Sequence, residues 1–164
     1  MGDDDVWYEL AYTVGTVHGL NAVADSGGRR PRLPLVEEGS ASGEVLGVFE
    51  EIKAFFEMDR VPNVYRGLAR RPGYLKDHWR YVRVALGDRR LDRLTKAVLA
   101  FGASVTARSD YGTDFFLREV QRLGLSEEGV WEVFHVVEQF NAVNKIADAL
   151  ALEPDMGTGL TPAE

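Results

Sequence analysis

The chain has 164 residues, of which 45% are hydrophobic and 27% are charged, with no cysteine and a formal net charge of −7. These values are typical of a single globular domain with its own core, and they exclude an intrinsically disordered chain. The lack of cysteine excludes disulfides and thiol chemistry, and the negative charge argues against nucleic acid as the main partner because phosphate binding requires a positive field.

The first 42 residues predict a helical extension followed by a connector. Apolar residues recur at helical spacing over residues 6–24, and three aspartates precede them at the expected helix N-terminus, although Gly15 and Gly19 weaken this helix. Residues 25–42 are rich in Gly, Ser, Arg and Pro, which is typical of a connector. No basic stretch precedes an apolar one, so we expect no signal peptide and a cytoplasmic location.

An all-α domain is predicted over residues 43–152, followed by a flexible tail at 153–164. Apolar residues recur with a period of about 3.6 residues, which together with the N-terminal segment predicts six or seven helices. The helices of the domain are expected to begin after Ser42, at Val61, at Pro72, near Leu91, at Asp110 and after Ser126, and the last one to end near Leu152. No stretch alternates with period two, so no sheet is expected.

Two segments of this pattern predict particular features of the fold. Gly124-Leu125-Ser126-Glu127-Glu128 combines a C′ glycine, an N-cap serine and first-turn acids, which predicts a helix-to-helix junction. The helix that begins near Leu91 is apolar nearly all round in its second half, so we expect it to be the buried central helix. Its uncharged run, Ala97 to Ala107, is too short to span a bilayer.

Three segments carry motifs of a known family. They are VPNVYRGLARRP at residues 61–72, the LR…GLS-x-E pattern at residues 117–128, and FNAVNKIADAL at residues 140–150. In order and spacing they resemble the alkylhydroperoxidase D-like and carboxymuconolactone decarboxylase-like domains, over roughly residues 40–155. The resemblance implies a helical bundle of that fold and a homo-oligomer, at least a dimer.

The same resemblance indicates where the chemistry of the family would lie. Peroxidase members carry Cys-x-x-Cys and then a histidine, and counting back from Gly124 these positions hold Ser109, Gly112 and Phe116; a family glutamate aligns near Ala97. A serine hydroxyl cannot replace a redox-active thiolate. We therefore predict no thiol-dependent peroxidase activity.

A second resemblance leaves an enzymatic hypothesis open. Residues 41–53 and 61–79 resemble one repeat of the group I haloacid dehalogenases, which are built from such helical repeats and work without cysteine. The resemblance implies an aspartate that activates water to displace halide from a 2-haloacid, but the last helix offers Glu132 and Glu138 in place of the expected aspartate. The two hypotheses are therefore a cysteine-free hydrolase of this type and a catalytically silent subunit that binds a small molecule or assembles.

Candidate site residues lie at one helix N-terminus and on the last helix. The candidate catalytic residues are Asp110, Asp114, His135 and Glu138, and the candidate substrate-binding residues are Ser109, Tyr111, Asn141 and Asn144. A helix N-terminus suits a small anion, and His135 suits a general base, so we expect both groups to line one cavity. Each of these residues also has a structural interpretation. Asp110 can cap the helix, the Tyr111 ring can pack in the core, and His135 can be a hydrogen-bonded, partly buried histidine.

The remaining polar residues predict no further site. His18 and His78 have no acid or histidine at i+4, so no metal site and no cofactor are expected. From Arg66 to Arg93 there are nine basic residues and three acidic ones, which could attract an anion but are more typical of solvated helix faces. The expected partners are a second copy of the chain and a small anionic molecule, without nucleic acid or membrane.

Overall fold

The structure is a computed structural model that describes residues 4–25 and 34–153. These ranges contain seven α-helices and no strand, which confirms the predicted all-α class. The helices are α1 (Asp4–Asp25), α2 (Gly43–Phe56), α3 (Asn63–Leu68), α4 (Pro72–Leu86), α5 (Arg93–Thr106), α6 (Asp110–Arg122) and α7 (Glu127–Ala149), with a 3-10 turn η1 (Glu38–Ser40) before α2. The tail predicted at 153–164 lies, from residue 154 on, outside the described residues, as does the part of the connector at 26–33.

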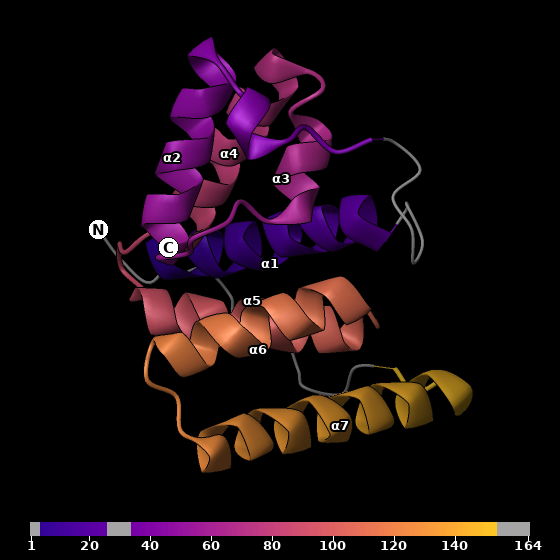
Figure 1. The fold of residues 1–164 in the computed structure, drawn as a ribbon. Coiled ribbons are helices and arrows are strands. Elements are labelled where there is room, and N and C mark those ends of the chain that lie inside the picture. The colour runs from indigo at the N-terminus through magenta and orange to yellow at the C-terminus, as the bar shows by residue number, and fades with distance from the viewer. Residues whose placement is uncertain (1–3, 26–33, 154–164) are drawn as a thin grey trace, which may run out of the picture.

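The helices lie in tiers (Figure 1). α2, α3 and α4 form the upper tier, α1 crosses beneath them, α5 and α6 lie side by side below α1, and α7 lies along the far side of α5. α1 packs against α4, α5 and α6, and its Val17 and Leu20 are buried in the common core. The helix that the sequence suggested to be an extension therefore forms a layer of the bundle.

Side-chain caps define the starts of the lower helices. The Asp92 carboxylate accepts a hydrogen bond from Thr95 N at 2.7 Å at the start of α5, and the Ser126 hydroxyl accepts one from Gly129 N at 3.1 Å at the start of α7. Gly124 adopts a φ of 99°, a conformation that glycine tolerates far better than other residues. The predicted junction between the last two helices is thereby confirmed.

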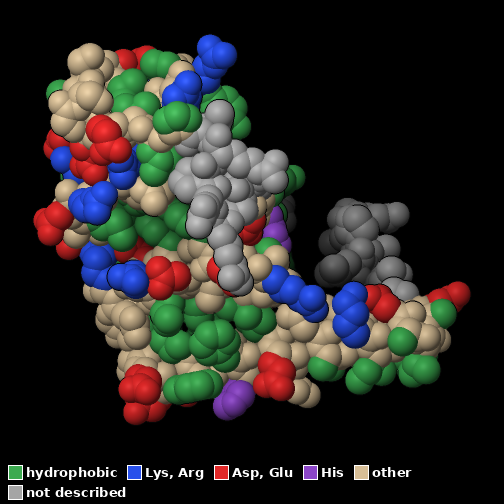
Figure 2. All heavy atoms as spheres, turned by 45° about the vertical axis from the view of Figure 1, so that its right-hand side comes forward, with side chains coloured by type: hydrophobic (Ala, Val, Ile, Leu, Met, Phe, Trp, Pro, Cys, Tyr) green, Lys and Arg blue, Asp and Glu red, His purple; other side chains and the backbone are tan. Residues whose placement is uncertain are grey.

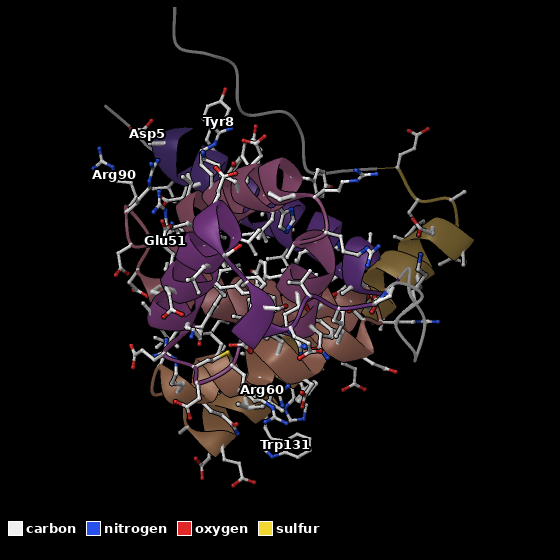
Figure 3. All side chains as sticks on the ribbon, turned by 45° about the horizontal axis from the view of Figure 1, so that its top comes forward. Asp5, Tyr8, Glu51, Arg60, Arg90 and Trp131 are labelled. Atoms are coloured by element: carbon white, nitrogen blue, oxygen red, sulfur yellow. The ribbon has the colours of Figure 1, made fainter. Side chains whose placement is uncertain are left out.

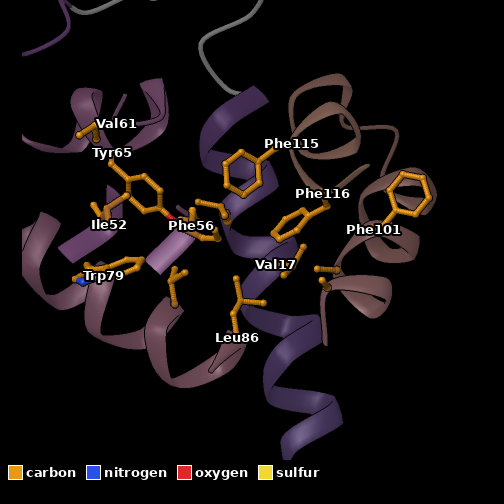
Figure 4. Close-up of a cluster of buried hydrophobic side chains, with 14 of the residues drawn as sticks. Val17, Ile52, Phe56, Val61, Tyr65, Trp79, Leu86, Phe101, Phe115 and Phe116 are labelled. Atoms are coloured by element: carbon orange, nitrogen blue, oxygen red, sulfur yellow. The ribbon is translucent and has the colours of Figure 1, made fainter. Parts of the chain in front are cut away.

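An aromatic cluster joins the upper tier to the lower one. The Phe56 ring of α2 meets Phe115 of α6 edge to face, with 5.0 Å between ring centroids. Tyr65 and Trp79 pack edge to face at 5.8 Å on the other side of Phe56, as Figure 4 shows. Such pairs add to the free energy gained by burying apolar area, so this cluster helps to hold α6 in place beneath α2.

A buried ion pair ties α1 to α5. Lys96 is completely buried in the first turn of α5, the helix predicted to be central. Its ammonium group pairs with Glu9 of α1 and donates a hydrogen bond to Gly87 O at 2.5 Å. Asp5 and Arg90, 3.7 Å apart, lie at the same corner of the molecule (Figure 3). The start of α1 is thus held by charge as well as by apolar packing.

α7 differs from the other long helices because little of it is covered. Of its 23 residues only Val130 is buried, and its C-terminal end projects past α5 and α6 (Figure 1). Large apolar side chains are exposed along its length: Trp131, Val136, Phe140, Val143, Ile146 and Leu150. Figure 2 shows hydrophobic side chains along the projecting part. No helix within the described ranges is long and apolar enough to cross a membrane.

Candidate functional site

The N-terminus of α6 occupies the position where the resemblance places the family's chemistry. Ser109 is the N-cap of this helix, and its buried hydroxyl accepts a hydrogen bond from Gly112 N at 3.0 Å. The same hydroxyl donates to a carboxylate oxygen of Asp25, at the end of α1, at 3.0 Å. Both roles are structural, because they fix the start of α6 and attach α1 to it.

The space above Gly112 is filled by α1. Asn21 is buried and donates a hydrogen bond to Ser104 Oγ at 3.1 Å, and Ser104 in turn donates to Ala100 O at 2.8 Å. A Cβ atom on residue 112 would lie 2.1 Å from Asn21 Oδ1 and 2.8 Å from Ser104 Oγ. A cysteine, or any other side chain, therefore fits at position 112 only if Asn21 moves.

The other candidates on α6 have ordinary structural surroundings. Asp110 is exposed, and Asp114 is exposed and ion-paired with Arg118 at 3.2 Å. The Tyr111 hydroxyl accepts a hydrogen bond from Val64 N at 3.4 Å, its ring stacks on Phe115 with 6.4 Å between centroids, and burial raises the pKa of this hydroxyl. Asp114 is thus paired with Arg118, Tyr111 packs against the α6 core, and both carboxylates are open to solvent.

A cleft between α5 and α7 contains three of the residues predicted on the last helix. This cavity of about 510 Å³ is lined by Val105, Thr106, Arg108, Trp131, Phe134, His135, Val137, Glu138 and Asn141. Hydrophobic side chains gather in the hollow above α7 (Figure 2). The volume is within the usual range for small-molecule sites.

The polar groups of this cleft are few and exposed. Asn141 donates hydrogen bonds to Val137 O at 2.8 Å and to Thr106 Oγ1 at 3.3 Å, so it ties α7 to the end of α5. His135 and Glu138 are exposed on successive turns of α7. Asn144 does not line the cavity. One imidazole, one carboxylate and the Arg108 guanidinium can therefore meet a ligand here.

The single shared cavity predicted from the sequence does not form. The cleft reaches Arg108, directly before Ser109, but none of Ser109, Asp110, Tyr111 and Asp114 belongs to its lining. Ser109 turns inward to cap α6, and Asp110 and Asp114 are exposed to solvent. His135 and Glu138 thus lie together, apart from the α6 carboxylates.

Sequence reasoning missed the residues that define the α6 site. Asn21 and Asp25 lie more than 80 positions before Ser104 and Ser109 in the chain, and neither belongs to a recognisable motif. The described residues contain no group of three or more His, Asp or Glu side chains placed to hold a metal ion.

Comparison with known structures shows which fold the chain shares. No protein-family model matches the sequence, and no curated protein matches it. The fold is similar to the crystal structure of the alkylhydroperoxidase AhpD core from Rhodospirillum rubrum, with a TM-score of 0.71 and 26% sequence identity, over 76% of this chain and 93% of that chain. The chain is therefore a cysteine-free protein of the alkylhydroperoxidase D-like fold.

Proposed function

We propose that this protein is a self-assembling subunit of the alkylhydroperoxidase D-like fold that carries out no thiol chemistry. The observation that carries this proposal is the row of large apolar side chains exposed along α7, from Trp131 to Leu150. Contiguous exposed apolar surface is typical of protein–protein interfaces. The absence of cysteine supports the second half of the proposal, and a side chain at position 112 would require Asn21 to move.

Two measurements on the purified protein test this proposal. Light scattering at micromolar concentration should give a mass of at least twice the 18.2 kDa of one chain. Peroxide consumption with an added dithiol should stay at the level of a buffer blank. A monomeric protein would contradict the assembly, and turnover in metal-free and haem-free protein would contradict the absence of redox chemistry.

A second candidate function is hydrolysis of an anionic substrate in the cleft between α5 and α7. It is supported by the presence of His135, Glu138 and Arg108 in one cavity, since these could supply a base, an acid and a cation. Halide release from a panel of 2-haloacids tests it, with His135→Ala and Glu138→Gln as variants. Release by the unmodified protein and loss in both variants is expected of a hydrolase, whereas no release from any member of the panel would exclude the dehalogenase type.

A further inference from the structure

α7 has two separate apolar faces. The inner face packs on the bundle through the buried Val130, through Phe134, whose ring centroid lies 5.2 Å from that of Phe101, and through Val137 beside Gly102. The outer face carries Val136, Phe140, Val143, Ala147 and Leu150. Four of these five are exposed, Ala147 is half-buried, and they follow one another at intervals of four, three, four and three residues. This spacing aligns them along one side of a helix, as in the seam of two helices that pack lengthwise.

Between Val136 and Leu150 the outer face carries no charge, and the nearest charge on the same line is Glu132, one turn before Val136. Its five apolar residues are flanked by Gln139, Asn144 and Ile146, which are also uncharged, although the protein has a formal net charge of −7. When two copies of the same surface meet, a charge on one copy lies near the same charge on the other. Like charges across an interface oppose association. A neutral face therefore suits a second copy of the chain, whereas a strongly acidic or basic partner would find no complementary charge on it.

The sizes of the side chains select the orientation of the pair. In an antiparallel pair centred on Val143, Val136 of each helix lies opposite Leu150 of the other, and Phe140 lies level with Ile146, one residue or about 1.5 Å from the level of Ala147. The large Phe140 ring then lies beside the small Ala147 across the contact, as close packing requires. A parallel pair would instead oppose phenylalanine to phenylalanine and alanine to alanine, which leaves a bulge beside a gap. The antiparallel arrangement also opposes the two helix dipoles favourably.

From these observations we infer that a second copy of the chain covers the outer face of α7, with the two α7 helices antiparallel about a two-fold axis at Val143. The inference rests on the proposed self-assembly and specifies its surface and its geometry. The contact is self-complementary, as expected for a closed two-fold dimer.

Disulfide cross-linking can test this geometry on a clean background, because the chain has no cysteine. In Val143→Cys the two thiols would lie at the axis, within reach of the roughly 4–7 Å Cα separation that a disulfide needs, so mild oxidation should give mostly covalent dimer. Val136→Cys is the matched control, since Val136 and Val143 are 57% and 52% exposed on the same helix. Its two copies would lie 14 residues apart along the helices, about 21 Å, and should not cross-link.

Further variants separate specific pairing from random collision. A mixture of Val136→Cys and Leu150→Cys proteins should form mixed dimers, because these two positions face each other in the antiparallel pair. Leu46→Cys, exposed on α2, should remain monomeric on a non-reducing gel. Circular dichroism should show unchanged helix content in every variant, since all four side chains are exposed.

The outcomes distinguish the geometry from the assembly itself. Cross-linking of Val136→Cys as efficient as that of Val143→Cys would overturn the antiparallel arrangement. An oligomeric wild-type protein whose Val143→Cys form does not cross-link would overturn this inference and leave self-assembly standing. A wild-type protein that is monomeric by light scattering would overturn both.

Discussion

Replacement of Gly112 by alanine should destabilise the protein, although it adds only one methyl group to a helix. Within an ordinary helix this change stabilises by about 0.5–1 kcal/mol. Here the new Cβ would lie 2.1 Å from Asn21 Oδ1, so Asn21 must move and lose its hydrogen bond to Ser104. A buried amide without a partner costs about 1–3 kcal/mol, and overpacking costs a further 1–3 kcal/mol or so. We expect a net loss of about 2–4 kcal/mol in the free energy of unfolding.

Urea denaturation followed by far-UV circular dichroism measures this loss directly. Gly47→Ala is the matched control, because a Cβ on Gly47 in α2 meets nothing within 4 Å, and this variant should gain about 0.5–1 kcal/mol. Adding Asn21→Ala to Gly112→Ala should cost less than the two single changes together, since the clash is then removed. A Gly112→Ala protein as stable as the wild type would show that α1 does not fill this space.

Further predictions concern the buried ion pair and the cleft. Glu9→Ala should lower the free energy of unfolding by about 3–5 kcal/mol, because the fully buried Lys96 loses its partner; adding Lys96→Met should restore much of the loss in urea denaturation. Burial alone would raise the pKa of Glu9, but its hydrogen bond and attraction to Lys96 outweigh this and lower it. Its contribution to stability is therefore fully present above the unfolded value of 4.5 and is lost as the pH falls through the lower folded pKa; an equal acid dependence in Glu9→Gln would contradict this. His135→Ala should change stability by less than about 0.5 kcal/mol, because the side chain is exposed, and a larger thermal shift would reveal an unrecognised contact.

The sequence predicted the start of a lower helix well where a capping residue precedes it. Ser126 accepts the hydrogen bond expected of an N-cap, and Gly124 takes the positive φ expected between α6 and α7. At the start of α6 the cap is Ser109, one residue before the Asp110 considered from the sequence. The part played by α1 was not predictable in this way. Gly15 and Gly19 lower its intrinsic helix propensity, and its position depends on tertiary contacts such as the hydrogen bond from the Thr13 hydroxyl to Ala85 O, 72 residues away.

The apolar pattern of α7 illustrates a second limit. Val130, Phe134 and Val137 appear in the sequence to continue into Phe140 and Val143 as one stripe. The intervals from Phe134 to Val143 are three residues each, however, and every such step turns the stripe by about 60° around a helix of 3.6 residues per turn. The first residues therefore face α5 and the later ones face solvent. The periodicity predicted the helix, but only its packing shows that α7 has two apolar faces, one of them uncovered.

The packing of α1 as an inner layer has a consequence for how the chain could be divided. α1 is held by the buried Val17 and Leu20, by the Glu9–Lys96 pair and by the Asn21–Ser104 hydrogen bond, all of them non-covalent. Residues 34–164 produced alone would lack that layer and expose the apolar surfaces of α4 and α5 that α1 covers. A separate peptide of residues 1–25 would offer the same contacts in trans. We therefore expect the two fragments, when mixed, to recover the helix content of the intact chain in circular dichroism.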